Sequence, residues 1–485
     1  MIITLKNFGP IRELSLDLSK DLHLLYGKNG VGKSYAGYAV YILLKNIQKR
    51  LQTYANEGQD RRPLFTNAKE LEQKILSSEA SVSTWDITGK VNQMIQEEFD
   101  AYILPEIKNS FLNTFSNLNA LSNRKSKEVF SITLVGKLGI SYTVSLENGV
   151  LTSTHSNPIS YSICKNDQNE YRLFMELETI KQEMSFNDNS TSLDNLAPLS
   201  AVLSISSLVI CYGGIGDVFY LPSSRSGLYE GLNAFSPIMA QLTQSRFLLQ
   251  NTKIELPTLT EPVSDYYIDL STLDAQKANP SFERIIQKIE KEIIQGEVRY
   301  DKENKKISVY HKEIDIELHA AQSSSMVAEL APLVLFLKHI IHNKYGYIGD
   351  KIAFISQENN SPFIFPNTKP QHILFIEEPE THLHPELQVK LMEVFAELSQ
   401  LNIKVFLTSH SNYMFNKLNN QVLKKEVGYE KVAVYHLIDS PEGAIQNPEM
   451  TMTEEGAFDE NFQSITEELF DERMNALDEL DDADR

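Results

Sequence analysis

Residues 27–34 read GKNGVGKS. An apolar run, LHLLY at 22–26, precedes them, and a pattern typical of a helix follows from about residue 33 to 52. The spacing matches G-x-x-x-x-G-K-[ST], a strand–loop–helix motif in which backbone N–H groups surround phosphate oxygens. A chance glycine-rich turn is the alternative. The strand before the loop and the helix after it favour a phosphate loop.

Each residue type in this loop has a chemical role. Glycines permit the sharp backbone turns, Lys33 reaches the β- and γ-phosphates, and Ser34 offers its hydroxyl to Mg²⁺. We therefore predict that ATP binds to Gly27, Lys28, Asn29, Gly30, Val31, Gly32, Lys33, Ser34 and Tyr35.

A second stretch, ILFIEEPE at 373–380, joins an apolar strand to two carboxylates. Acidic groups at the carboxyl end of a strand lie at the crevice where α/β proteins bind ligands. We expect Glu377 to bind Mg²⁺, directly or through water, and Glu378 to orient or deprotonate an attacking water. The alternative is a simple helix start, which the acids and Pro379 also favour.

A third strand, KVFL at 404–407, leads to Thr-Ser-His-Ser at 408–411. A histidine just past a buried strand can hydrogen-bond a γ-phosphate and the water beside it. A single histidine is more often structural, but His410 follows the carboxylate pair by about thirty residues. We therefore treat His410, with Glu378, as a candidate catalytic residue.

The order of elements indicates an α/β fold. A chain of 485 residues exceeds one ordinary compact core, and strands alternate with helices at the start and again after about residue 300. The pattern between is irregular, with a hairpin-like alternation at 130–144. We predict a nucleotide-binding core at 1–50 and 300–440, an inserted helical and β lobe at 51–299, and an acidic helical tail at 441–485.

Composition narrows the function classes. The net charge is −20, and residues 451–485 contribute thirteen acidic residues against two arginines. This balance argues against wide non-specific DNA binding but leaves a local basic groove possible. Two distant cysteines, Cys164 and Cys211, suit a reducing cytosol. We expect no signal peptide at the N-terminus. For the little-charged stretch 195–216 we favour a buried helix and strand over a membrane span, because Pro198 and several serines and glycines interrupt it.

Four segments together resemble one family: KNFGPI at 6–11, GKNGVGKS, IEEPETHLHP at 376–385 and TSHS at 408–411. They resemble the ABC-type ATPase domain that SMC, RecF and OLD (overcoming lysogenisation defect) proteins share, and most of all its OLD-like branch. The resemblance covers about residues 1–50 and 300–440. It implies an ABC-type P-loop ATPase core, split by the mixed α+β insertion, with ATP and Mg²⁺ as cofactors.

The resemblance also implies roles for single residues. Glu377 matches the Walker B magnesium residue, where ABC proteins usually have Asp, Glu378 matches the catalytic glutamate, and His410 matches the switch histidine. FYLPSSRSGL at 219–228 resembles another segment of the branch, in which Arg225 makes either a structural ion pair or a nucleotide contact. The alternating histidines at 382 and 384 suggest loop structure more than a metal pair.

The family has a signature segment ahead of the Walker B strand. Residues 322–327, QSSSMV, occupy that place but lack the glycines of LSGGQ. A serine at a helix N-terminus still meets the physical need, so we expect Ser324 or Ser325 to contact the γ-phosphate on another subunit. The alternative is a plain helix N-cap. The resemblance thus implies a homo-oligomer, a dimer or larger, that ATP closes and hydrolysis releases.

OLD nucleases carry a Toprim nuclease after the ATPase. We expect none here, because only about 75 residues follow His410 and they end in an acidic run. The resemblance suggests a separate effector, such as a nuclease in anti-phage defence. The helical spacing at 458–480 marks either a docking helix or a terminal helix packed on its own core. Three alternatives stay open. The first is a RecF- or SMC-like DNA maintenance ATPase that binds DNA, and the second is a non-hydrolysing scaffold. The third is a transporter subunit with a membrane partner, which the long insertion and the absent LSGGQ disfavour; we expect no membrane partner.

Overall fold

A computed structural model describes residues 1–56, 83–126, 128–165, 171–177, 180–185, 214–229, 231, 259–274, 279–301, 306–341, 371–457 and 468–477. The buried helix and strand expected in the stretch 195–216 lie almost entirely outside these residues, since only 214–216 are described. All statements below refer to the described residues.

An eleven-stranded sheet forms the centre of the molecule. Its order is β11-β15-β16-β3-β17-β18-β2-β1-β5-β6-β7, and the first five strands run parallel. Strands β2, β1, β5, β6 and β7 pair antiparallel, and the short β18 joins the two halves. The strands are β1 (Ile2–Phe8), β2 (Ile11–Asp17), β3 (Leu22–Gly27), β5 (Phe130–Val135), β6 (Ser141–Glu147), β7 (Val150–Ser156), β11 (Ile215–Leu221), β15 (Gln371–Glu377), β16 (Ile403–Ser409), β17 (Val432–Ile438) and β18 (Ala444–Gln446).

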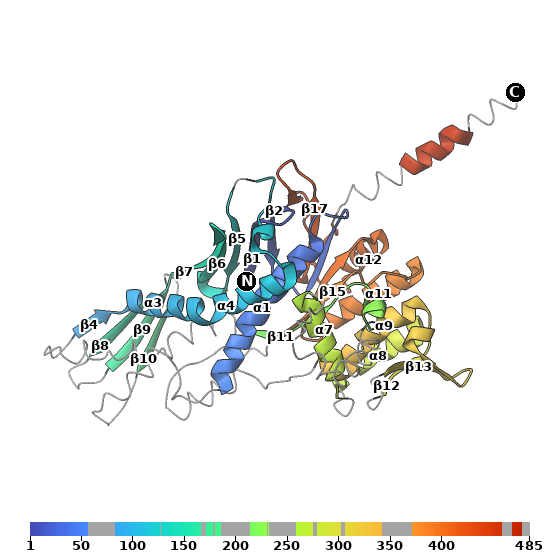
Figure 1. Ribbon diagram of the computed structural model, residues 1–485, viewed down its shortest axis with the longest axis horizontal. Helices are drawn as coiled ribbons and strands as arrows, with labels where there is room; N and C mark the ends of the chain where they lie inside the picture. The colour runs from blue at the N-terminus through green and yellow to red at the C-terminus, as the bar shows by residue number, and fades with distance from the viewer. Residues whose placement is uncertain are drawn as a thin grey trace, which may run out of the picture.

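Helices cover both faces of the parallel strands (Figure 1). One face packs on α1 (Lys33–Asn56), and α4 (Leu104–Phe115) and α3 (Thr88–Glu98) lie against that helix or the neighbouring β7. The other face packs on a second group: α7 (Glu261–Ser271), α8 (Glu283–Lys288), α9 (Ser325–Leu335), α11 (Pro385–Leu398) and α12 (Asn412–Leu423). Along β15, Ile373 and Phe375 join the first core and Leu374 and Ile376 the second. This alternation, apolar on both sides, is what a parallel strand between two helical layers requires.

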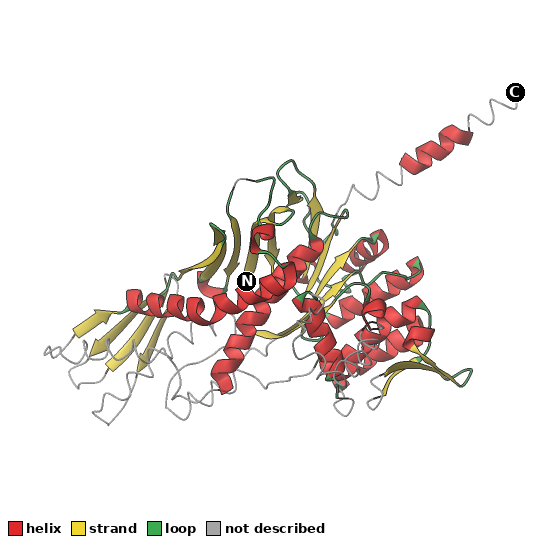
Figure 2. Ribbon diagram, viewed as in Figure 1, coloured by secondary structure: helices red, strands yellow, loops and turns green. Residues whose placement is uncertain are grey.

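Two smaller sheets flank this centre (Figure 2). A four-stranded sheet is formed by β4 (Ser83–Asp86), β8 (Ser160–Lys165), β9 (Tyr171–Leu177) and β10 (Ile180–Ser185). A three-stranded sheet is formed by β12 (Glu297–Asp301), β13 (Lys306–His311) and β14 (Ile316–His319). The first extends the molecule beyond α3 at one end in Figure 1.

The α/β fold class is confirmed, but the division of the chain differs from the expected one. Strands β5, β6, β7 and β11 come from residues 51–299, yet they hydrogen-bond within the main sheet rather than in a separate lobe. The tail expected at 441–485 likewise contributes β18 to the sheet and Met450 to the core. Local periodicity identifies a strand but not its partner, because pairing is decided by tertiary contacts.

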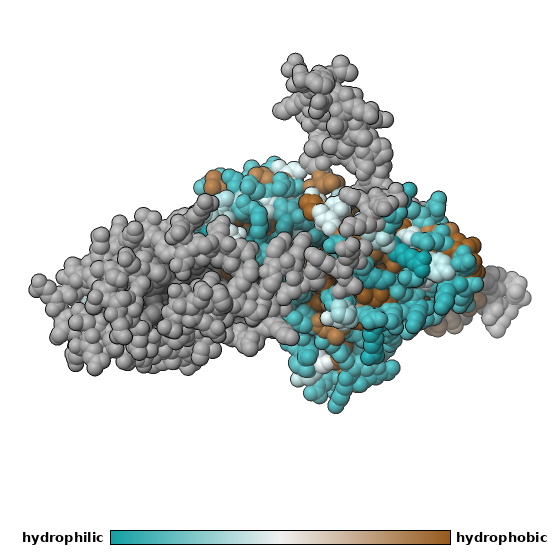
Figure 3. All heavy atoms as spheres, turned by 90° about the horizontal axis from the view of Figure 1, so that it is seen from below, coloured by the Kyte–Doolittle hydropathy of each residue, from teal (hydrophilic) through white to brown (hydrophobic). Residues whose placement is uncertain are grey.

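The described part of the tail helix, residues 468–477, has all its side chains exposed, including Leu469 and Phe470 at 61% each. In Figure 1 it stands away from the body. It therefore does not pack on the chain's own core. None of the described helices is long and apolar enough to cross a bilayer. On the face in Figure 3, hydrophilic side chains cover most of the described surface.

Candidate nucleotide site

The loop at 27–34 joins the buried strand β3 to α1, as the motif predicts. Gly27, Gly30 and Gly32 all have positive φ, at 145°, 81° and 101°. A Cβ on Gly27 would lie 2.4 Å from the Leu437 carbonyl oxygen, and one on Gly32 would lie 2.7 Å from the Pro10 side chain. These two positions therefore need glycine for both conformation and space, while Gly30 needs it for conformation alone.

Lys33 folds its side chain back into the loop. Its Nζ donates hydrogen bonds of 2.9 Å to the carbonyl oxygens of Gly27 and of Lys28. Burial lowers the pKa of Lys33 to about 8, against the opposing charges of Glu378 and Glu380. The ammonium group thus lies at the centre of the loop, where an anionic phosphate would stabilise its charged form.

The carboxyl ends of β3, β15, β16 and β11 meet at one edge of the sheet, since these strands are parallel neighbours. Glu377 is the last residue of β15 and is 2% exposed. Its Oε2 accepts long hydrogen bonds from the Ser223 N–H, at 3.4 Å, and the Tyr38 hydroxyl, at 3.5 Å. Burial raises the pKa of Glu377 above its ordinary value, and the nearby Ser34 hydroxyl opposes this rise only in part.

The Oε1 atom of Glu377 is buried and has no hydrogen-bond partner among the described residues. An orphaned carboxylate oxygen beside a hydroxyl is an oxygen donor set that suits Mg²⁺. Ser34 and Glu377 therefore fit the predicted metal ligands.

Glu378 and His410 come together as predicted. Oε1 of Glu378 lies 3.6 Å from Nε2 of His410, and both side chains are about one third exposed. The close contact with His410 and its charge, then the charge of Lys33, lower the pKa of Glu378. Glu378 also has a positive φ of 42°, an uncommon conformation for a residue with a side chain. Such backbone strain clusters at functional sites, and the ionised carboxylate is poised to accept a proton.

Sequence reasoning missed Glu380, the third acid of ILFIEEPE. Its Oε1 accepts hydrogen bonds from the backbone N–H of His410, at 2.6 Å, and from the Ser409 hydroxyl, at 2.8 Å. Burial raises the pKa of Glu380. Glu380 thus holds the end of β16 in place, and His410 with it. The acidic run EEPE in the sequence was the feature that could have identified Glu380.

The other predicted residues take varied positions. Ser324 is an exposed N-cap of α9, accepting a 3.4 Å hydrogen bond from Val327 N–H, and Ser325 is exposed as the first residue of that helix. Among the described residues, no hydrogen bond or ion pair joins either serine to the phosphate loop of the same chain. Both are thus free to face another subunit, and the simple N-cap alternative is equally satisfied.

Around the loop, Lys28 and Asn29 are exposed and Val31 is buried. The ring of Tyr35 packs on Phe115, with centroids 4.9 Å apart. His384 caps α11 by accepting a hydrogen bond from the Glu386 N–H, which is a structural role. The described residues hold no cluster of three or more metal-ligating side chains.

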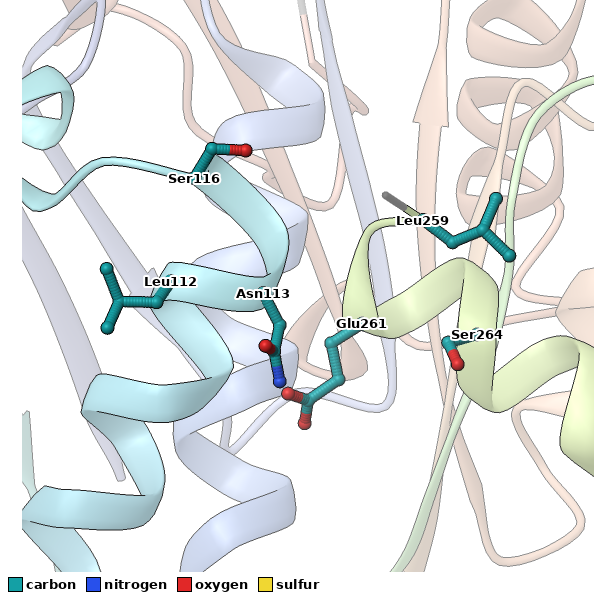
Figure 4. Close-up of a pocket in the computed structure, with 6 residues that line it drawn as sticks. All are labelled: Leu112, Asn113, Ser116, Leu259, Glu261 and Ser264. Atoms are coloured by element: carbon teal, nitrogen blue, oxygen red, sulfur yellow. The ribbon is translucent and has the colours of Figure 1, made fainter. Parts of the chain in front are cut away.

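A cavity of about 390 Å³ lies elsewhere, between α4 and α7. Figure 4 shows Asn113 and Glu261 pointing toward each other across it. Glu261 is already bound to Lys45 and to the Ser110 hydroxyl, at 2.9 and 2.8 Å. The lining of this cavity includes no residue of the strand ends described above, so the cavity is not the nucleotide site.

The chain belongs to the family described as AAA ATPase domain, whose model matches residues 1–415. It is thus a P-loop ATPase of that family, and the match spans the phosphate loop, both carboxylates and His410. No curated protein matches its sequence.

Among solved structures, the chain is similar to the SMC head domain from Thermotoga maritima, at 12% identity and a TM-score of 0.32, over 92% of this chain and 97% of that one. It is also similar to an SmcHead bound to the C-winged helix domain of ScpA, at 10% identity and a TM-score of 0.33, over 92% and 96%. A third match is an Smc head domain with an extended coiled coil bound to the C-terminal domain of ScpA derived from Pyrococcus furiosus, at 11% and 0.31, over 96% and 98%.

Proposed function

We propose that this protein is an ABC-type switch that binds and hydrolyses ATP, assembles through nucleotide sites shared between subunits, and controls a separately encoded effector. The observation that carries the proposal is the convergence at one sheet edge of the phosphate loop, the Glu377–Glu378 pair and His410. A structural glycine turn would not need Lys33 buried at the loop centre near the carboxylates of Glu378 and Glu380.

The chemistry follows from the positions of these side chains. Lys33 and the loop N–H groups bind the phosphates, and Ser34 and Glu377 would hold Mg²⁺, which neutralises phosphate charge. Glu378 accepts the proton of the attacking water, and His410 orients Glu378 and the terminal phosphate. The side chain of Glu378, a residue with a left-handed backbone, is 39% exposed, so water can reach its carboxylate.

Assembly is proposed because, among the described residues, no hydrogen bond or ion pair joins Ser324 or Ser325 to the phosphate loop of their own chain. The exposed Ser324 and Ser325 at the N-terminus of α9 are suited to a γ-phosphate held by another subunit. ATP would then close a dimer or a larger ring, and hydrolysis would open it.

For the effector, we propose a nuclease acting in anti-phage defence, by analogy with the OLD-like branch. The exposed apolar residues of the helix at 468–477, within an acidic tail, are a reasonable place for such a protein to dock.

The test measures ATP turnover and solution mass for the wild type, Lys33→Ala and Glu378→Gln, each with and without ATP. We expect hydrolysis by the wild type, no nucleotide binding by Lys33→Ala, and a larger assembly of Glu378→Gln that persists in ATP. If neither wild type nor Glu378→Gln binds ATP or changes mass, the proposal is wrong. Turnover that DNA stimulates would instead favour a DNA maintenance ATPase of SMC or RecF type.

A further inference from the structure

A buried arginine–glutamate pair lies beneath the nucleotide site. Arg225 is the first residue of the helical turn at 225–229 that follows β11, and Glu329 lies in the second turn of α9. Both side chains are 1% exposed, and Arg225 Nε lies 3.3 Å from Glu329 Oε2. Buried ion pairs cost desolvation energy, so a fully buried one is a poor way to gain stability. The buried position of the Arg225–Glu329 pair therefore needs an explanation other than stability.

The guanidinium of Arg225 joins three separate elements. Nε donates to the backbone oxygen of Glu329, at 3.0 Å, within α9. Nη1 donates to the backbone oxygens of Pro222 and Glu377, at 2.9 Å each. One planar group thus binds the β11 loop, the end of β15 and the helix that begins with Ser324 and Ser325.

The contact with the Glu377 oxygen has a direct consequence for the neighbouring catalytic residue. That oxygen belongs to the peptide group between Glu377 and Glu378. The N–H of the same peptide group donates a 2.9 Å hydrogen bond to the Thr408 oxygen of β16. Arg225 and Thr408 therefore hold this peptide from both sides, which fixes the left-handed backbone of Glu378.

Glu329 does not depend on the guanidinium alone. Its carboxylate also accepts hydrogen bonds from the backbone N–H groups of Arg225 and Ser226, at 3.0 and 3.2 Å, and from the Ser226 hydroxyl, at 2.6 Å. A change limited to the guanidinium therefore leaves the carboxylate with three donors, so the fold can persist.

We propose that Arg225 is a positioning residue that couples the catalytic Glu378 to helix α9, so that hydrolysis at one site and the contact of α9 with another subunit depend on the same side chain. The inference rests on the proposed function. It gives the segment FYLPSSRSGL a role in the ATPase cycle without any contact between Arg225 and nucleotide.

The test is Arg225→Lys, made alone and together with Glu378→Gln. Lysine keeps the charge but cannot donate to all three elements at once. For Arg225→Lys alone, we expect nucleotide affinity within about twofold of wild type, an ATP KM changed less than about threefold, and kcat lower by at least about tenfold. For the double variant, we expect ATP-dependent assembly at least about tenfold weaker than that of Glu378→Gln.

A matched control is Arg50→Lys. Arg50 on α1 is 15% exposed at its side chain and pairs with the buried Glu98 at 2.6 Å, and its guanidinium lies over the ring of Tyr102. We expect it to lower the melting temperature while kcat and assembly stay within about twofold. All assays run well below both melting temperatures.

Two outcomes overturn the inference: Arg225→Lys that keeps both kcat and assembly, or Arg50→Lys that loses them to the same extent. Failure of the proposed function looks different, because Glu378→Gln with Arg225 intact would then not assemble in ATP. In that case the kcat of Arg225→Lys alone tests the positioning role, and an unchanged kcat still overturns it.

Discussion

The two halves of the main sheet differ in what they can do. In the parallel half, β3 and β16 are buried along their whole length, on both faces. In the antiparallel half, β5 and β6 alternate between buried and partly exposed residues. The first pattern requires cover on both faces and the second only on one.

This difference decides where chemistry is possible. Parallel neighbours end at the same edge, so the residues that follow them gather there: the phosphate loop after β3, Glu378 after β15 and His410 after β16. Antiparallel neighbours end alternately at opposite edges, so their loops do not converge. The antiparallel half instead supports the site from beside it, as Pro10 and Ile11 do against Gly32.

The largest expected effect is that of Glu378→Gln, which removes the proposed proton acceptor at the edge where the parallel strands end. We expect kcat to fall about 10²- to 10⁴-fold, the range for loss of a general base. Single-turnover ATP hydrolysis measures it. The matched control is Glu13→Gln on β2 of the antiparallel half, an exposed glutamate paired with Lys6. An equal loss in the control would contradict the division between the halves.

A smaller loss is expected from Gly32→Ala. The added Cβ meets the Pro10 and Ile11 side chains at 2.7 and 2.8 Å, at a φ of 101°. We expect ATP affinity to fall at least about tenfold, because the loop N–H groups must turn away from the phosphates. Titration with a fluorescent nucleotide measures this. Gly30→Ala is the comparison, since open space surrounds that position. If it weakens binding more than Gly32→Ala, the steric argument is wrong.

The dependence of ATP binding on pH should be weaker still. Burial lowers the pKa of Lys33 to about 8, so free protein loses this charge as pH rises through 8. From pH 8 to 9 the charged fraction falls about fivefold, and ATP affinity should fall by up to that factor. Phosphate restores the charge, so binding should take up protons. Calorimetry at pH 8.5, in buffers with different ionisation heats, detects this, and no proton uptake would refute the assignment.

The same shift acts in the opposite direction on stability. The unfolded chain keeps its Lys33 proton up to the ordinary pKa of 10.5, so between about pH 8 and 10.5 the unfolded state binds more protons than the folded one. The Lys33 contribution to the free energy of unfolding should therefore rise with pH across this window, while ATP affinity falls. The opposite signs separate loss of charge in the loop from general alkaline unfolding.

Local sequence predicted the parallel half well, for a physical reason. Apolar runs that end in GKNGVGKS, in Glu377-Glu378 and in His410 are each complete within about ten residues, and strand ends of this kind meet at one edge. Only α/β topology had to be assumed to bring them together.

Pairings over long sequence distances were not predictable in the same way. β11 lies beside β15 although about 150 residues separate them, and Arg225 binds Glu329 across 104 positions. Periodicity reports which face of a strand is apolar, but not which strand lies next to it. The hairpin at 130–144 was identified for that reason, while its pairing with β1 was not.

The smallest effect is expected from a glycine in the antiparallel half. Asn148 and Gly149 connect β6 to β7, with φ of 51° and 78°, as a two-residue hairpin turn of the Asn-Gly kind. Gly149→Ala should lower the free energy of unfolding by about 1 kcal/mol, measured by denaturant titration, and leave ATP affinity unchanged. Gly149 and Gly30 have nearly the same φ, so an alanine strains the backbone about equally at either position. If Gly30→Ala weakens ATP binding and Gly149→Ala does not, the place of the glycine in the fold, and not backbone strain, decides its effect on function. Equal loss in both would mean that the antiparallel half takes part in binding.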